Sequence, residues 1–191
     1  DIWHYRRRAR LGVKLVEKKG GILVGFREKD SPYIADIAQC EDLDKSIGYR
    51  LGELRTLLGG LWIANKIPQL EVAIGDSTTA IIVRHLDVLS TEDIVRLAEF
   101  QKQMKISLFL QPAGEDSGHP LNSDTGHLAY SVEGINFQFT PVNFVQVKHA
   151  INVKMINAVI ENLAVVRTDQ LPDLICRLGQ FSPPLPLTTH S

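Results

Sequence analysis

Hydrophobic and polar residues alternate along the first part of the chain in a way that is typical of strands. Residues 5–16 and 22–27 form two such runs, and Gly20 and Gly21 between them favour a tight turn. A third, shorter run covers residues 33–37. The pattern therefore predicts a hairpin followed by one more strand.

Further along, apolar residues recur at the spacing that marks one face of a helix. Ser90 and Asp93 resemble a capping box at the start of one such helix, which continues to Met104. Residues 112–126 are rich in Gly, Ser and Asp and predict an exposed loop. The other predicted elements are helices at 43–58 and 150–163 and strands at 70–74, 80–85, 106–110, 128–132 and 135–139. Together they predict an α+β fold with a mainly antiparallel sheet and flanking helices.

Length and charge narrow the functional classes. With 191 residues, 44% of them hydrophobic, the chain is long enough to build one full core. Its 21 Lys and Arg against 22 Asp and Glu give a net charge of -1, so affinity for a polyanion would depend on how the charges are arranged. No apolar run approaches the ~20 residues of a membrane span, which predicts a cytoplasmic protein.

Two cysteines, Cys40 and Cys176, lie far apart and without CxxC spacing. They predict neither a disulfide framework nor a self-sufficient metal site. The chain also begins without an initiator methionine, which predicts a fragment or a processed form of a longer protein.

The basic run at the start of the first strand is the most informative local feature. Arg6, Arg8, Arg10 and Lys14 fall on one face of a strand, about 7 Å apart for each step of two residues, whereas Arg7 falls on the other face. This spacing is close to that of successive phosphates on a single nucleic-acid strand, so the row predicts a polyanion contact. A solvated edge strand, protected from aggregation by charge, would give the same pattern.

Aromatic residues lie close to this row along the sequence. Trp3, His4, Tyr5 and Phe26 would be suited to stacking on unpaired bases. Aromatic side chains beside strands are also common members of a core. Both interpretations stay open at this point.

Several motifs, taken in order, resemble the central domain of ribosomal-RNA uracil-5-methyltransferases. They are Tyr5-Arg-Arg-Arg-Ala-Arg10-Leu, Gly25-Phe26-Arg27, Ile34-Ala-Asp-Ile37 leading to Cys40, Phe139-Thr-Pro141, Phe144-Val-Gln146-Val and Asn152-Val-Lys-Met155. The resemblance covers roughly residues 1–175, and the three-arginine motif is most similar to the branch that acts on bacterial 23S ribosomal RNA.

This resemblance implies an enzyme that transfers a methyl group from S-adenosylmethionine to carbon 5 of a uridine. Such chemistry needs a cysteine thiolate that adds to carbon 6 and a base that removes the carbon-5 proton, on a uridine drawn out of its stack. The implied partner is ribosomal RNA, and no protein partner is indicated. The implied roles are RNA contact for Arg6, Arg7, Arg8, Arg10, Phe26 and Arg27, and contact with the cofactor and the flipped uridine for Phe144 and Gln146.

By the same resemblance, Cys40 matches the fourth cysteine ligand of an iron-sulfur cluster, whose other three ligands are absent here, so we expect no cluster in this chain. Residues 173–181 resemble the first cofactor-binding motif of the methyltransferase domain, with Asp173 and Gly179 retained. Arg177 replaces its first glycine and Pro172 interrupts the preceding strand, which predicts obstructed cofactor binding.

We therefore expect two regions: a central RNA-binding α+β domain over 1–145, and a linker helix with the truncated start of a Rossmann-like methyltransferase domain over 146–191. Without the catalytic cysteine and base, the chain is predicted to be an inactive RNA-recognition fragment. Lys148 stands where the family has an asparagine in its Phe-x-Gln-x-Asn motif. The alternative is a non-enzymatic α+β binding module whose basic strand contacts another anionic partner.

Overall fold

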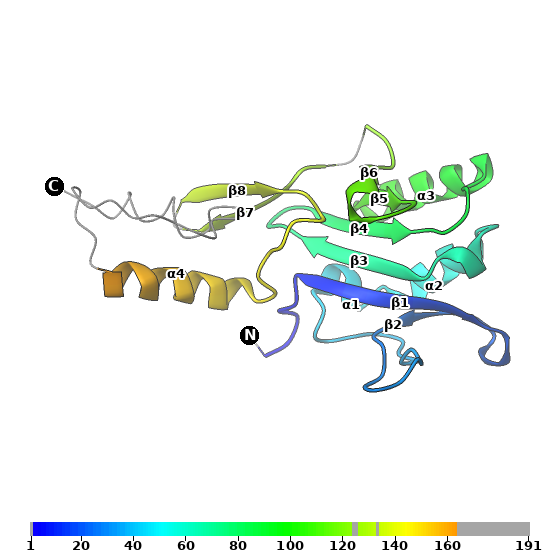
Figure 1. Cartoon of the computed structure of the whole chain (residues 1–191), viewed down its shortest axis with the longest axis horizontal. Coiled ribbons are helices and arrows are strands. Elements are labelled where there is room, and N and C mark those ends of the chain that lie inside the picture. Colours follow the sequence, from blue (N-terminus) through cyan, green and yellow to red (C-terminus); the bar gives the residue numbers. More distant parts are fainter. Residues whose placement is uncertain (1, 124–125, 133, 164–191) are drawn as a thin grey trace.

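A six-stranded sheet forms the centre of the computed structural model, which describes residues 2–123, 126–132 and 134–163 (Figure 1). Its strand order is β2-β1-β3-β4-β5-β6, and every neighbouring pair is antiparallel except β4 with β5. The mainly antiparallel α+β fold expected from the sequence is confirmed. The strands are β1 Arg8–Val16, β2 Gly21–Gly25, β3 Gln69–Ile74, β4 Thr79–Arg84, β5 Ser107–Gln111 and β6 His119–Pro120.

The predicted N-terminal hairpin is present as β1 and β2. A single 3-10 turn, η1 (Glu17–Lys19), joins them, and Gly20 ends it with a φ of 81°, a left-handed conformation that favours glycine. Val13 pairs with Val24 across the ladder. Regular pairing begins at Arg8, so the strand predicted from residue 5 starts three residues later than expected.

Helices cover one face of this sheet. The predicted helix 43–58 is wrong as a single element, because α1 (Lys45–Gly48) and α2 (Leu51–Gly59) are separate. The carbonyl of Gly48 accepts a hydrogen bond from the amide of Cys40 at 2.9 Å. Its partner therefore lies outside the helix, at the residue where α1 ends.

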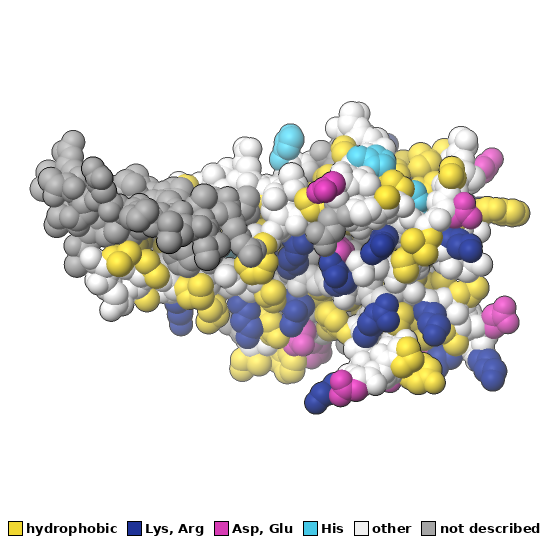
Figure 2. All heavy atoms as spheres, in the orientation of Figure 1, with side chains coloured by type: hydrophobic (Ala, Val, Ile, Leu, Met, Phe, Trp, Pro, Cys, Tyr) yellow, Lys and Arg dark blue, Asp and Glu magenta, His cyan; other side chains and the backbone are white. Residues whose placement is uncertain are grey.

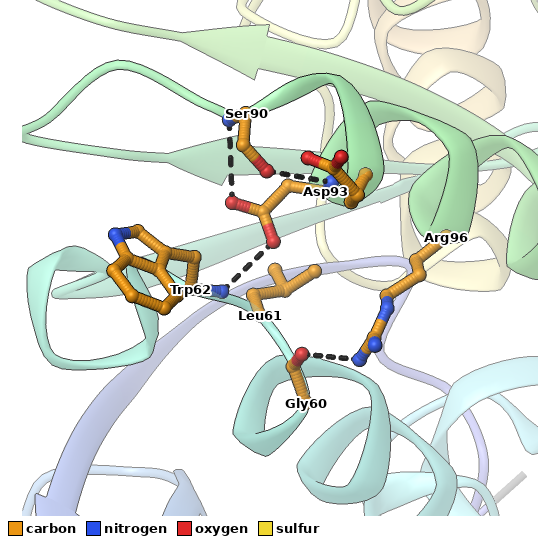
Figure 3. A pocket seen from close by; sticks show the side chains of 7 residues that line it. Gly60, Leu61, Trp62, Ser90, Asp93 and Arg96 are labelled. Atoms are coloured by element: carbon orange, nitrogen blue, oxygen red, sulfur yellow. Dashed lines mark hydrogen bonds between the residues drawn. The ribbon is translucent and has the colours of Figure 1, made fainter.

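The parallel pair β4 and β5 is connected by α3 (Thr91–Met104), whose predicted capping box is confirmed. The Ser90 hydroxyl accepts from the amide of Asp93, and the Asp93 carboxylate accepts from the amide of Ser90 (Figure 3). The same carboxylate also accepts the Trp62 amide at 2.8 Å. The start of α3 is therefore fastened to the segment that follows α2.

Alternation along the strands gives the sheet one apolar face and one mixed face, on which charged residues stand among buried Ala73, Ala80 and Ile82. Leu11, Val72, Ile81 and Leu108 point to the helical side and are at most 1% exposed, in one core with α1, α2 and α3. The other face turns toward the viewer in Figure 1, with α1 and α2 behind the sheet. We call the following residues of that opposite side the polar face: Arg8, Arg10, Lys14, Gln69, Glu71, Arg84 and Gln111.

A second, smaller core lies at one end of the sheet. The hairpin of β7 (Leu128–Val132) and β8 (Ile135–Phe139) packs with Ile156 of α4 (His149–Leu163) and with Ala73 and Ala80 of the sheet. Gly75 comes so close to the Ala129 carbonyl that a Cβ atom there would clash with it. The hairpin is thus seated by direct backbone contact, and Figure 1 shows it beyond the end of β3 and β4.

One predicted strand is wrong. Residues 33–37 form no strand, and they contact the hairpin through an isolated bridge between Arg27 and Ile34. Ile34 packs closely over Gly12, which accounts for the apolar character of this segment without regular pairing. Across the described ranges, no helix is long and apolar enough to cross a membrane.

Candidate nucleic-acid interface

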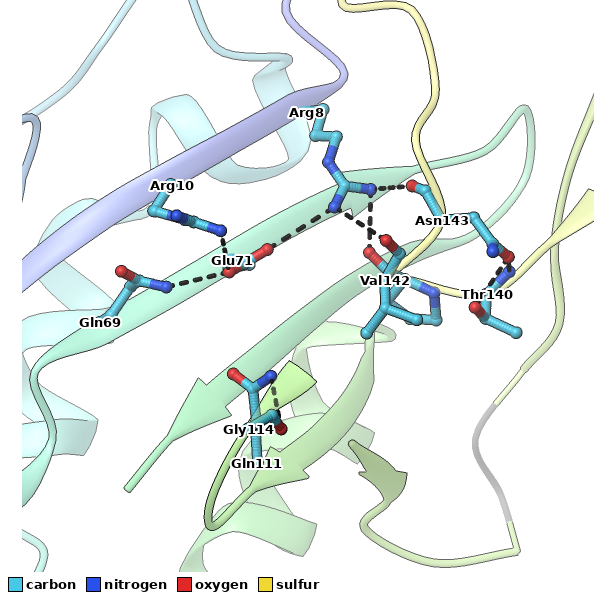
Figure 4. A network of polar contacts seen from close by, with 10 residues as sticks. Arg8, Arg10, Gln69, Glu71, Gln111, Gly114, Thr140, Val142 and Asn143 are labelled. Atoms are coloured by element: carbon cyan, nitrogen blue, oxygen red, sulfur yellow. Dashed lines mark hydrogen bonds and ion pairs between the residues drawn. The ribbon is translucent and has the colours of Figure 1, made fainter. Parts of the chain in front are cut away.

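Arg8 and Arg10 share a single carboxylate on the polar face. Arg10 lies directly opposite Glu71 in the β1–β3 ladder, and its guanidinium approaches the Glu71 carboxylate at 2.9 Å. Arg8, two residues earlier, reaches the other carboxylate oxygen at 3.6 Å. Gln69 donates a further hydrogen bond to Glu71 at 2.9 Å. Figure 4 shows the resulting network, in which one acidic group holds two cations.

The two arginines differ in what else they contact. Arg8 donates to the backbone carbonyls of Pro141, at 2.9 Å, and of Asn143, so it binds the loop that follows β8 (Figure 4). Its side chain is 22% exposed, whereas that of Arg10 is 62% exposed. Arg8 therefore has a structural role, whereas most of the Arg10 side chain faces solvent.

Arg7 points away from this network, as the alternation predicted. Its guanidinium forms an ion pair with Asp76 at 2.6 Å, and Asp76 also accepts from the amide of Ser131 on β7. Burial acts to raise the pKa of Asp76, but the hydrogen bonds from Arg7 and Ser131 outweigh it and hold the pKa below its ordinary value. Arg7 thus links the sheet to the β7–β8 hairpin.

Arg6 lies in a cluster of aromatic and cationic groups. Its guanidinium carbon is 5.7 Å from the centre of the Phe26 ring and 6.0 Å from that of Tyr5. Lys148, the bridge partner of Arg6, places its ammonium 3.9 Å from the centre of the Tyr5 ring. These are cation–π contacts, and within the described residues the Arg6 guanidinium has no carboxylate partner.

The predicted row of parallel arginines is therefore corrected in part. Arg8 and Arg10 do lie on one face, but both are tied to Glu71, and Arg6 precedes the regular strand and stacks on aromatic rings instead. Cross-strand neighbours that a single strand cannot reveal account for this difference. The surface is still basic, and Glu71 neutralises part of its positive charge.

The other predicted contact residues are spread around this surface. Arg27 is exposed just beyond β2, next to half-buried Phe26. Phe144 is 49% exposed and Gln146 is half-buried, both in the segment that leads into α4. A ring and an amide are groups that can contact a planar base or an adenine ring, and the assignment of Phe144 and Gln146 to the cofactor and the uridine stays a prediction.

Cys40 is a half-buried free thiol, and its amide donates to Gly48. No group of three or more His, Cys, Asp or Glu within the described residues is arranged to hold a metal. An iron-sulfur cluster normally needs four thiolates, so the two cysteines of this chain do not fit one by themselves. Asp173 and Gly179, together with Pro172, Cys176 and Arg177, lie outside the described residues.

Sequence reasoning missed three residues that shape this surface. Glu71 and Arg84 both fall on the polar face by the alternation of their strands, so the strand pattern contained a signal for them. Lys148 departs from the family's motif, but no sequence pattern indicates its contact with Tyr5.

Comparison with known proteins supports the resemblance seen in the motifs. The chain is 41% identical over 98% of its length to the 23S rRNA (uracil(1939)-C(5))-methyltransferase RlmD of Bordetella avium, of which it covers 40%. It is 42% identical over 98% of its length to the protein of the same name from Cupriavidus necator, of which it covers 43%. The chain thus spans about two fifths of these relatives. No protein-family model matches.

A solved structure shares the fold. The tRNA (uracil-54, C5)-methyltransferase of Pyrococcus abyssi, in complex with S-adenosyl-L-homocysteine, superposes with a TM-score of 0.70 at 16% identity. The match covers 97% of this chain and 47% of that one. At this identity the likeness establishes the arrangement of strands and helices alone.

Proposed function

We propose, from the homology of this chain to the 23S rRNA uracil-C5-methyltransferases, that it is the RNA-contacting segment of an enzyme of that kind. The observation that carries the proposal is 41–42% identity to relatives of that name across 98% of the chain. The protein would place a methyl group from S-adenosylmethionine on carbon 5 of a uridine in ribosomal RNA. It would accordingly act in the cytoplasm.

The chemistry of this reaction defines what the segment has to supply. A thiolate adds to carbon 6 of the uracil ring, and a base later removes the proton from carbon 5. We assign neither role to a residue of this chain. Its described residues would instead hold the RNA backbone and present the flipped uridine, which must leave its stack before the reaction.

Two parts of the surface support an RNA contact. Arg10 offers a largely exposed guanidinium on the polar face, and Glu71 fixes its direction. Arg6 and Lys148 offer a second pair of cations, stacked on Tyr5 and Phe26. Phosphate oxygens are the natural partners of such groups, and Phe144 and Gln146 would meet the base or the cofactor.

A binding titration with a fluorescein-labelled RNA stem-loop that carries an unpaired uridine tests the proposal. We expect binding that weakens steeply between 50 and 200 mM salt, roughly in proportion to the phosphates contacted. Arg6→Gln and Arg10→Gln should each weaken it by about tenfold. Lys102→Gln, a control at an exposed position of α3, should leave it unchanged.

The alternative function makes a different prediction in the same assay. A binding module for another anionic partner would show no affinity for the stem-loop at low salt, or an affinity insensitive to Arg6→Gln and Arg10→Gln. Either result would remove the RNA assignment.

A further inference from the structure

Arg84 lies on the polar face, at the last position of β4. The ladder places it directly between Gln69 of β3 and Gln111 of β5. Both neighbours are uncharged, and both amide groups donate elsewhere, to Glu71 and to the Gly114 carbonyl. Neither therefore neutralises the guanidinium.

The Arg84 side chain is half-buried and has no polar partner among the residues that the structure describes. Its Nε is shielded from solvent and makes no hydrogen bond, and none of the ion pairs in the described part of the chain includes it. A partly desolvated cation without a partner is unfavourable, because it loses hydration and gains no protein contact in return. An anionic ligand would supply the missing contact.

The acidic residue that the strands carry on this side is already engaged. Glu71 is the sole acidic residue within the described strands β1 to β5, and it is held by Arg8, Arg10 and Gln69. Three guanidinium groups therefore face one carboxylate across β1, β3 and β4. Figure 2 shows Lys and Arg side chains gathered over this part of the surface, with few acidic ones among them.

We propose that Arg84 binds a phosphate of the RNA strand, as a contact separate from the N-terminal arginine segment. This inference rests on the function proposed above. Arg10 on β1 and Arg84 on β4 are two strands apart, about 10 Å across the sheet, so one strand of RNA that crosses the sheet would reach both. The planar fork of arginine suits phosphate oxygens, and the residues that flank Arg84 in the ladder are uncharged amides.

Two measurements on the whole chain test this contact. In the stem-loop titration, Arg84→Gln should weaken binding by about tenfold and lower the slope of log Kd against log salt by about 1. Arg84→Lys should lose less RNA affinity than Arg84→Gln, because lysine keeps the positive charge but lacks the planar guanidinium. Lys102→Gln removes the same charge from the helical side and should change neither quantity.

The second measurement is made on the wild-type chain, and a variant serves only to assign the signal. The Nε–H resonance of Arg84, identified by its loss from the otherwise unchanged spectrum of folded Arg84→Lys, should shift when RNA is added to the wild-type chain. If the wild type binds RNA while Arg84→Gln leaves affinity and slope intact and this resonance stays in place, the Arg84 contact is wrong and the proposed function stands. If the wild type binds no RNA, both fail together.

Discussion

The two faces of the six-stranded sheet are stabilised by different forces. On the helical face, Leu11, Ile81 and Leu97 are fully buried among other apolar side chains. On the polar face, contacts are made by charges arranged around Glu71. Burial of apolar area stabilises a fold strongly and depends little on exact side-chain geometry. Exposed ion pairs stabilise it weakly and depend on the positions of both charges. The helical face therefore contributes most to the stability of the fold, and the polar face determines which charges the fold exposes.

The largest effect should come from removing apolar volume on the helical face. Leu97 of α3 is 0% exposed, so Leu97→Ala would leave a cavity and lower the free energy of unfolding by about 3 kcal/mol. Chemical denaturation measures this loss. Val95→Ala, at a half-exposed position of the same helix, should change stability by less than about 0.5 kcal/mol. Equal losses in the two variants would contradict the assignment of this face as the stabilising one.

A smaller effect should separate the two arginines of the polar face. Arg8→Ala removes the donor to the Pro141 and Asn143 carbonyls and should cost about 2 kcal/mol of unfolding free energy. Arg10→Ala breaks a more exposed ion pair with the same carboxylate and should cost less than about 1 kcal/mol. Denaturant unfolding of both variants checks the order. A larger loss for Arg10→Ala would show that Arg8 does not anchor the loop.

The smallest effect is a dependence of stability on pH, which arises where the sheet contacts the β7–β8 hairpin. Burial, together with the charge of Arg7, lowers the pKa of His149 below its ordinary 6.5, although Asp76 partly opposes this. Because the folded state favours neutral His149, stability is full above pH 6.5 and declines as the pH falls below that value. The lowered pKa of Asp76 acts in the same direction at lower pH, below its ordinary 3.8.

Thermal unfolding at pH 7.0 and 5.5 tests this sign. The wild-type Tm should fall over this interval, and the fall should be smaller in His149→Gln. In Asp76→Asn, the Tm should still fall between pH 7.0 and 5.5. Its further fall at pH 3 should be smaller than in the wild type. A wild-type Tm that rises on acidification to pH 5.5 would contradict the direction of the His149 shift.

Elements with a strong local signal were predicted well from the sequence. The capping box at Ser90 and Asp93 identified the start of α3, and alternation identified the strands of the β7–β8 hairpin. The prediction of a strand at 33–37 was wrong because Ile34 is buried by contact with Gly12 and not by pairing in a β-ladder. Apolar character alone does not distinguish these two ways of burying a residue.

The candidate site was predictable as a basic region but not as a geometry. Alternation correctly placed Arg8 and Arg10 together and Arg7 on the opposite side. It could not show that Glu71 joins Arg8 and Arg10, or that Lys148 lies over Tyr5, because these contacts join segments far apart in the sequence. The division of the chain at residue 145 stays a prediction.

Glu71 also acts as a counterion built into the protein. A free cation near RNA exchanges places with small ions from the atmosphere around the nucleic acid, whereas a cation already neutralised by the protein contributes less to that exchange. Arg8 and Arg10 share the one negative charge of Glu71. The number of ions displaced on binding should therefore be lower than the number of arginines in the run 6–10 suggests.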